Sequence, residues 1–325
     1  MPSSKDTPLK NRWPGAVPRG ILKELRPLVP RARKEPRRGV PRGVPRGVPR
    51  EVPRGACPEN PGKPLRGKPL RGDPRNKFVN NYNMLLDNFP KVLWINLDRS
   101  GDRRRHMEKL LNSNKINHQR IKAIDGLTRQ LSDICIPNRH LTRGENACTA
   151  SHLLALKYFV ENIRDQLIII FEDDVSFDFL KYIPYNWSEL VSHLPLNYDI
   201  IQLAITLENQ PIKTHLVKSS PDMRYFCSCA YLITKEAASK LLHKYWPKNS
   251  PKINLCNQKY ATSDSMITSS EGSYSIPIFT YGTYQSTIHP MHLPMHTKSK
   301  QSQLKEWMSL SKTFDKDSYF GSWES

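Results

Sequence analysis

Three consecutive carboxylates, Glu172, Asp173 and Asp174, directly follow the apolar run Leu167–Phe171. Adjacent anions repel and raise one another's pKa, so such a cluster at the end of a buried strand is costly unless a cation lies beside it. Hard oxygen ligands suit Mg²⁺ or Mn²⁺, and a metal held there would neutralise a diphosphate. The cluster therefore indicates a metal-assisted nucleotide or nucleotide-sugar site. The alternative is a solvated acidic turn that only ends the strand.

A second polar group follows the apolar run Val92–Leu97, at a predicted strand-to-helix turn. Its candidate ligand-binding side chains are Asn96, Asp98, Arg99 and Arg103. Backbone N–H groups at a helix start face phosphates, and arginines pair with phosphates through two parallel hydrogen bonds. The alternative is a charged helix start stabilised by pairs such as Arg104–Glu108.

Two further residues are open to more than one interpretation. His152 lies inside a predicted helix and is either a core histidine or a ligand. Asp264 precedes a strand-like stretch and is a base, a substrate contact or a helix cap. The six cysteines are too few for a disulfide scaffold, and Cys227-Ser228-Cys229 has no second pair to complete a zinc spacing.

Alternating strands and helices must position these side chains. The predicted strands are Val92–Leu97, Arg120–Ile124, Leu167–Phe171, Tyr198–Leu203 and Tyr231–Ile233. The predicted helices begin near Ser100 or Asp102, span Gly144–Arg164, and follow a cap at Thr234. This order predicts an α/β fold with a mostly parallel sheet and helices on both faces. Ligands of such sheets bind at the carboxyl ends of the strands.

The excess of basic residues is concentrated at one end of the chain. The 325 residues carry a formal net charge of +20, and residues 1–76 alone hold 20 Lys and Arg against 6 Asp and Glu. The same segment has 16 of the 27 prolines, one aromatic residue and a G-V-P-R repeat over Gly39–Gly55. We therefore expect a disordered basic tail over 1–76 and one folded domain over 77–325. The tail could also hold an anionic partner such as nucleic acid or a membrane surface.

No stretch approaches the 18 or so apolar residues of a membrane span, and Met1–Lys5 has no apolar signal region behind it. These features predict a cytoplasmic location. No G-x-G-x-x-G, Walker A or G-x-S-x-G sequence is present, so dinucleotide, P-loop and hydrolase-elbow chemistry have no support.

Taken in order, these segments resemble glycosyltransferase family 25, which includes bacterial lipooligosaccharide galactosyltransferases and animal procollagen galactosyltransferases. The motifs that carry the resemblance are Val92–Arg99 with Asp102–Arg103, Arg120–Gly126, Gly144–His152, Ile170–Val175, Tyr198–Leu203 and Ala230–Ile233. Ala147 and Cys229 depart from the family pattern, which usually has glycine at the first position and glycine or threonine at the second.

The resemblance implies a GT-A type fold with a Rossmann-like sheet, a UDP-sugar donor, Mn²⁺ or Mg²⁺, and an inverting transfer of galactose or glucose to a glycan or protein hydroxyl. It assigns the metal and diphosphate to Asp173 and Asp174, with Glu172 supporting them or contacting the donor. It places Asn96, Asp98, Arg99 and Arg103 at the nucleotide, Ser151 and His152 at the donor pocket, and Asp264 as the base.

Two other functions remain open on the sequence. The chain could bind polyanions or nucleic acid and carry an inactive glycosyltransferase-like domain. It could also be another metal-dependent nucleotide enzyme, such as a nucleotidyltransferase.

Overall fold

The computed structural model describes residues 85–207, 213–220, 222, 225–282, 288 and 292–323. The predicted basic tail over 1–76 lies outside the described residues, so its disorder and its anionic partner stay predictions. No helix in the described part of the chain is both long and apolar enough to cross a membrane.

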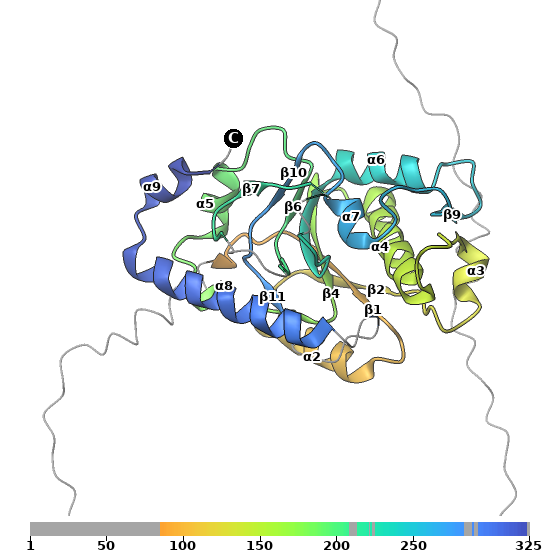
Figure 1. Ribbon diagram of the computed structural model, residues 1–325, viewed down its shortest axis with the longest axis horizontal. Coiled ribbons are helices and arrows are strands. Elements are labelled where there is room, and N and C mark those ends of the chain that lie inside the picture. Colours follow the sequence, from red (N-terminus) through yellow and green to blue (C-terminus); the bar gives the residue numbers. More distant parts are fainter. Residues whose placement is uncertain are drawn as a thin grey trace, which may run out of the picture. The chain divides into compact units, whose positions relative to one another are not determined.

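The described residues form a seven-stranded sheet in the order β2-β1-β4-β8-β6-β10-β7 (Figure 1). Its strands are β1 (Val92–Asn96), β2 (His118–Lys122), β4 (Leu167–Glu172), β6 (Ile200–Gln202), β7 (Val217–Lys218), β8 (Ala230–Thr234) and β10 (Ser273–Ser275). Five of them run in one direction, and β8 and β7 run in the other. The prediction of a mostly parallel sheet is confirmed, with β8 as an antiparallel strand between β4 and β6.

Two short sheets and the helices complete the described structure. The short sheets pair β5 (Val175–Ser176) with β11 (Thr280–Tyr281) and β3 (Cys135–Ile136) with β9 (Ile253–Asn254). The helices are α2 (Gly101–Ser113), α3 (Gln130–Ile134), α4 (Arg143–Asn162), α5 (Trp187–Ser192), α6 (Lys235–Tyr245), α7 (Ser263–Ile267), α8 (Leu293–Thr313) and α9 (Lys316–Gly321), with a short 3-10 helix at Leu180–Tyr182.

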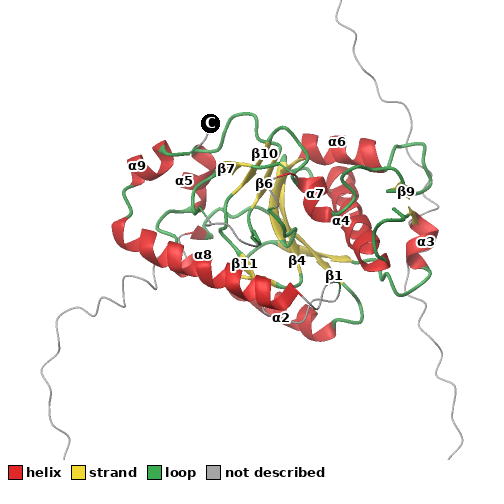
Figure 2. Cartoon of the chain, in the orientation of Figure 1, coloured by secondary structure: helices red, strands yellow, loops and turns green. Residues whose placement is uncertain are grey.

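Helices cover both faces of the sheet, as predicted (Figure 2). Helices α2, α5, α8 and α9 pack on one face, and α3, α4, α6 and α7 pack on the other. In β1 all five side chains are buried, with Trp94 on the α2 side and Leu93 on the α4 side. A strand covered on both faces buries side chains on each of them, which is why Val92–Ile95 is a continuous apolar run and the polar Asn96 comes only at its end.

The predicted strands form with their ends shifted by at most two residues. Thr234 caps α6 as predicted, with its side chain accepting a hydrogen bond from the N–H of Ala237. Asp264 is not a helix cap: Thr262 caps α7, and Asp264 lies in the first turn.

The order of the strands brings the polar motifs to one edge of the sheet. Strand β1 pairs with β4 in a register that sets Ile95 opposite Glu172, so Asn96 and Asp173 follow side by side. Because β8 is antiparallel, it begins where β4 ends, and the N–H of Glu172 donates to the carbonyl of Cys229 at 2.8 Å. The carboxyl ends of β1 and β4 and the start of β8 therefore share this edge.

The contact between β6 and β10 depends on a glycine. A Cβ atom at Gly272 would lie 2.6 Å from the carbonyl oxygen of Asn197 and 2.8 Å from the backbone nitrogen of Asp199. Both neighbours are backbone atoms of the segment that leads into β6, so they cannot move aside without shifting the strand.

We expect Gly272→Ala to lower the free energy of unfolding by about 1–3 kcal/mol, the usual cost of overpacking. Gly321→Ala is the matched control, because a Cβ atom there meets nothing within 4 Å. Urea unfolding of both variants checks this, and equal stabilities would show that the Gly272 contact imposes no constraint.

Candidate active site

Asp173 is held by two side chains from neighbouring elements. Its Oδ2 accepts a hydrogen bond from Asn96 Nδ2 at 2.6 Å, and its Oδ1 accepts one from Arg103 Nη1 at 2.8 Å. Asn96 Oδ1 in turn accepts from Arg120 Nε of β2 at 2.9 Å. Asp173 and Asn96 are both buried. This network joins the ends of β1 and β4 and the middle of β2 to the first turn of α2.

The neighbouring Asp174 lacks such a partner. Its Oδ1 atom is buried and has no hydrogen bond among the described residues. Burial raises the pKa of Asp174 to about 7, with further contributions from the negative charges of Glu172 and Asp173. A hard divalent cation would supply the missing positive charge and take an oxygen ligand, so Asp174 fits a Mg²⁺ or Mn²⁺ site.

Glu172 has different surroundings from Asp173 and Asp174, because its side chain lies beside α4. Its Oε1 accepts from Ser228 Oγ at 2.7 Å and lies 3.2 Å from Nε2 of His152. Burial acts to raise the pKa of Glu172, but the hydrogen bonds from His152 and Ser228 and the charge of Arg103 together hold it below its usual value. Glu172 is therefore the ionised neighbour that keeps the pKa of Asp174 high.

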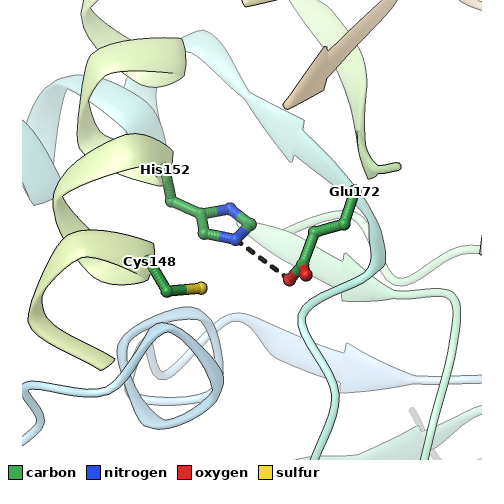
Figure 3. Close-up of side chains that lie close together, drawn as sticks. All are labelled: Cys148, His152 and Glu172. Atoms are coloured by element: carbon green, nitrogen blue, oxygen red, sulfur yellow. Dashed lines mark hydrogen bonds and ion pairs between the residues drawn. The ribbon is translucent and has the colours of Figure 1, made fainter. Parts of the chain in front are cut away.

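His152 is fully buried and bonded at both ring nitrogens, with Nδ1 3.0 Å from the hydroxyl of Tyr231. One turn earlier on α4 lies Cys148. The thiol of Cys148, the His152 ring and the Glu172 carboxylate each place one potential metal-ligand atom within 4.8 Å of the others (Figure 3).

Asp264 is half-buried in the first turn of α7, close to this group. Burial raises its pKa to about 6, and the charge of Glu172 adds to the shift, while the Ser228 hydroxyl, His152 and the Cys227 N–H oppose it. A carboxyl group with a pKa near neutrality is suited to proton transfer.

Two predicted nucleotide contacts lie on the loop after β1. Asp98 is half-exposed and pairs with Lys122 Nζ at 2.6 Å and with Arg120 Nη2 at 2.7 Å. Arg99 is 45% exposed and its Nε pairs with Asp125 Oδ2 at 2.7 Å. These two side chains reach solvent at the carboxyl edge, in contrast to the buried Asn96.

Ser151 is buried and bonded within the fold. Its hydroxyl donates to the carbonyl of Ala147 at 2.6 Å and accepts from the N–H of Ile124 at 2.9 Å. It joins α4 to the segment after β2, and its contact with a donor stays a prediction.

The structure thus joins Asn96, Arg103 and Asp173 in one network, and His152 and Glu172 in a second. Ser228, Tyr231 and Arg120 hold these residues in place, and none of the three was predicted as a site residue from the sequence. Arg120 lies on the second predicted strand, and the structure pairs that strand with β1. Ser228 and Tyr231 reach the site only because β8 is antiparallel. The direction of β8 could not be predicted from the sequence.

The sequence matches the family model of glycosyltransferase family 25 (LPS biosynthesis protein) over residues 89–255. It is 28% identical over 176 residues to procollagen galactosyltransferase 2 of Homo sapiens and 28% identical over 172 residues to procollagen galactosyltransferase 1 of Danio rerio. Each match covers 47% of this chain but only 27% and 28% of those proteins, so the chain spans less than a third of their length.

Among solved structures, the crystal structure of A197 from STIV is similar with a TM-score of 0.35 and 11% identity, covering 59% of this chain and 84% of that chain. A similarity this low carries no inference.

The Asp173 network should matter for stability as well as for the site. We expect Arg103→Ala to lower the free energy of unfolding by about 1–3 kcal/mol, because it leaves a buried carboxylate oxygen without its partner. Arg104→Ala is the matched control, since Arg104 lies on the same helix and its pair with Glu108 is exposed. If chemical denaturation finds the two variants equally stable, the network does not hold the sheet edge together.

Proposed function

Because the chain belongs to glycosyltransferase family 25, we propose that it transfers a hexose from a UDP-sugar to a hydroxyl acceptor, with inversion at the anomeric carbon. The relatives named above are galactosyltransferases, which favours UDP-galactose over UDP-glucose as the donor to test first. The acceptor belongs to the class of glycan or protein hydroxyls.

One observation carries the proposal: a buried carboxylate oxygen of Asp174 without a partner among the described residues, at the carboxyl edge of the sheet. Asp174 would hold Mn²⁺ or Mg²⁺, together with lone pairs of Asp173 that Asn96 and Arg103 leave available. The bound ion would neutralise the donor diphosphate and stabilise its charge as it leaves.

We assign the side chains around Asp174 to positioning the carboxylates and to contacting the nucleotide. Asn96 and Arg103 fix Asp173 and prevent its carboxylate from turning away. Asp98 and Arg99 reach solvent beside the end of β1 and would contact the nucleotide, where Arg99 can pair with phosphate. His152 and Ser151 are buried, so we assign them to positioning: His152 through Glu172, and Ser151 through the segment after β2.

Asp264 is our candidate base, although it lies beyond the residues matched by the family model. The oxygen of the acceptor hydroxyl would attack the anomeric carbon on the face opposite the leaving group. Its proton would pass to the Asp264 carboxylate as the bond from the anomeric carbon to the diphosphate oxygen breaks, releasing UDP. Glu172 supports this role because its negative charge keeps the pKa of Asp264 raised.

The sheet is also consistent with a GT-A type fold. Antiparallel β8 interrupts a set of parallel strands, and the acidic motif follows β4 beside it; we propose that this arrangement is of the GT-A type.

Removal of the Asp174 charge should separate activity from stability. We expect Asp174→Asn to reduce UDP release from UDP-galactose in the presence of Mn²⁺ by on the order of 10²–10³-fold, since charge stabilisation at the diphosphate is lost. The same change removes a repelled carboxylate whose pKa is about 7, so the metal-free variant should unfold at a temperature equal to or above that of the wild type.

Asp178→Asn serves as the control, because Asp178 is exposed and forms a surface pair with Lys300. Full UDP release by Asp174→Asn would overturn the assignment of the metal to this residue.

The proposed base should determine how kcat/KM depends on pH. Since burial raises the pKa of Asp264 to about 6, the carboxylate is protonated and inactive below that pH and ionised above it. We expect kcat/KM to rise with pH to a plateau, with a midpoint near 6, and Asp264→Asn to lower kcat by about 10²–10⁴-fold. Asp317→Asn, at an exposed first-turn position of the short helix α9, should keep wild-type activity. An active Asp264→Asn variant would rule out this base.

A further inference from the structure

We propose that Cys148, His152 and Glu172 form a zinc-binding site that is separate from the cation site at Asp174. The three residues come from two elements that the fold brings together, with two on α4 and one at the end of β4. Figure 3 shows their side chains converging on one point.

The spacing of the ligand atoms suits one small ion. Cys148 and His152 are four residues apart on a helix, so their side chains lie on the same face. His152 Nε2 and Glu172 Oε1 are 3.2 Å apart, and the three ligand atoms all lie within 4.8 Å of one another. Zinc bonds of about 2.0–2.3 Å place two tetrahedral ligands roughly 3.3–3.8 Å apart, so small rotations of these side chains would complete the site.

Each of the three ligands also has its own hydroxyl partner. Tyr231 OH lies 3.0 Å from His152 Nδ1, Ser228 Oγ donates to Glu172 Oε1 at 2.7 Å, and Ser263 Oγ lies 3.5 Å from Cys148 Sγ. Ser228 and Ser263 are themselves hydrogen-bonded at 2.8 Å. Metal ligands characteristically have such outer partners, which fix the ring of a histidine and the direction of a carboxylate.

The partner of His152 also permits the tautomer that a metal requires. Without a metal, Nε2 lies 3.2 Å from the Glu172 carboxylate, which can only accept when ionised, so a neutral ring donates from Nε2 and accepts at Nδ1 from the Tyr231 hydroxyl. With zinc on Nε2, the ring proton would sit on Nδ1 and be donated to the Tyr231 oxygen. The Tyr231 hydroxyl therefore bonds Nδ1 in both states with its direction reversed, while bonds from zinc to Nε2 and to Glu172 would replace the hydrogen bond between those two groups.

The chemistry of the donor set selects the metal. A thiolate and an imidazole favour Zn²⁺ over Mg²⁺ or Mn²⁺, which prefer oxygen ligands. Binding forms the zinc–sulfur bond as the Cys148 thiol proton passes to solvent. Three protein ligands leave a fourth tetrahedral position for an oxygen, and the Glu172 side chain, which is 26% exposed, gives solvent access to it.

Cobalt substitution tests the site directly. The full-length chain, stripped of metal and titrated with Co²⁺, should develop thiolate-to-cobalt charge-transfer absorption that saturates at one equivalent and is abolished by excess Zn²⁺. Cys148→Ser should abolish that absorption, while Cys256→Ser, at a half-buried cysteine on the loop after β9, should keep it. Absence of the absorption in the wild type, or its persistence in Cys148→Ser, would overturn the proposal.

A second pair of variants tests the outer partners without removing a ligand. Tyr231→Phe should weaken Zn²⁺ binding about 10–100-fold, measured by competition with a chromophoric chelator. Tyr245→Phe removes another buried tyrosine hydroxyl, which donates to the carbonyl of Tyr260, and should leave the affinity unchanged. Equal affinities in the two variants would contradict a metal on His152.

The cobalt–thiolate absorption and UDP release are separate readouts. Asp174→Asn should lose UDP release but keep the cobalt–thiolate absorption, whereas loss of both would show that the ions share one site and would overturn the proposal of a separate one. If the wild type lacks UDP release but shows the absorption, the zinc site stands and the proposed function fails.

Discussion

The edge of the sheet depends on how three adjacent negative charges are accommodated. Glu172, Asp173 and Asp174 are consecutive, and all three ionised in a partly buried place would repel one another. The structure compensates two of them from the protein itself. Arg103 and Asn96 hold Asp173, and His152 and Ser228 hold Glu172. The uncompensated charge then falls on Asp174, and this is what makes the edge a site for a cation.

Strand alternation explains why the three residues have such different surroundings. In β4, Ile168 and Ile170 face the α4 side, and Ile169 and Phe171 face the α2 side. The next two residues keep this alternation, so Glu172 points toward α4 and Asp173 points toward α2. The same periodicity in β1 places Asn96 on the side of Trp94 and hence next to Asp173. Two networks on opposite faces therefore follow from a period of two residues.

The strands and the edge of the sheet that carries the site could be predicted from the sequence, because local residue patterns determine them. Continuous apolar runs identified β1 and β4, and the rule that ligands bind at carboxyl ends placed Asn96 and Glu172 at one edge. The direction of β8 could not be predicted, because an apolar strand such as Ala230–Thr234 has the same pattern whether it runs parallel or antiparallel. Ser228 and Tyr231 therefore joined the site only through tertiary structure. The distinction between Asp173 and Asp174 was equally hidden, because it depends on which carboxylate meets Arg103.

The zinc spacing was missed for the same reason. A search for two close pairs of cysteines and histidines finds nothing around Cys227-Ser228-Cys229, yet Cys148 and His152 already form a pair one helical turn apart. Their third partner comes from β4 and becomes visible only when α4 packs on the sheet. The acidic motif would then serve two kinds of ion, since Glu172 faces sulfur and nitrogen donors on α4 whereas Asp174 offers only oxygen. The two residues would therefore suit different cations, because thiolate and imidazole donors prefer zinc whereas carboxylate oxygens prefer Mg²⁺ or Mn²⁺.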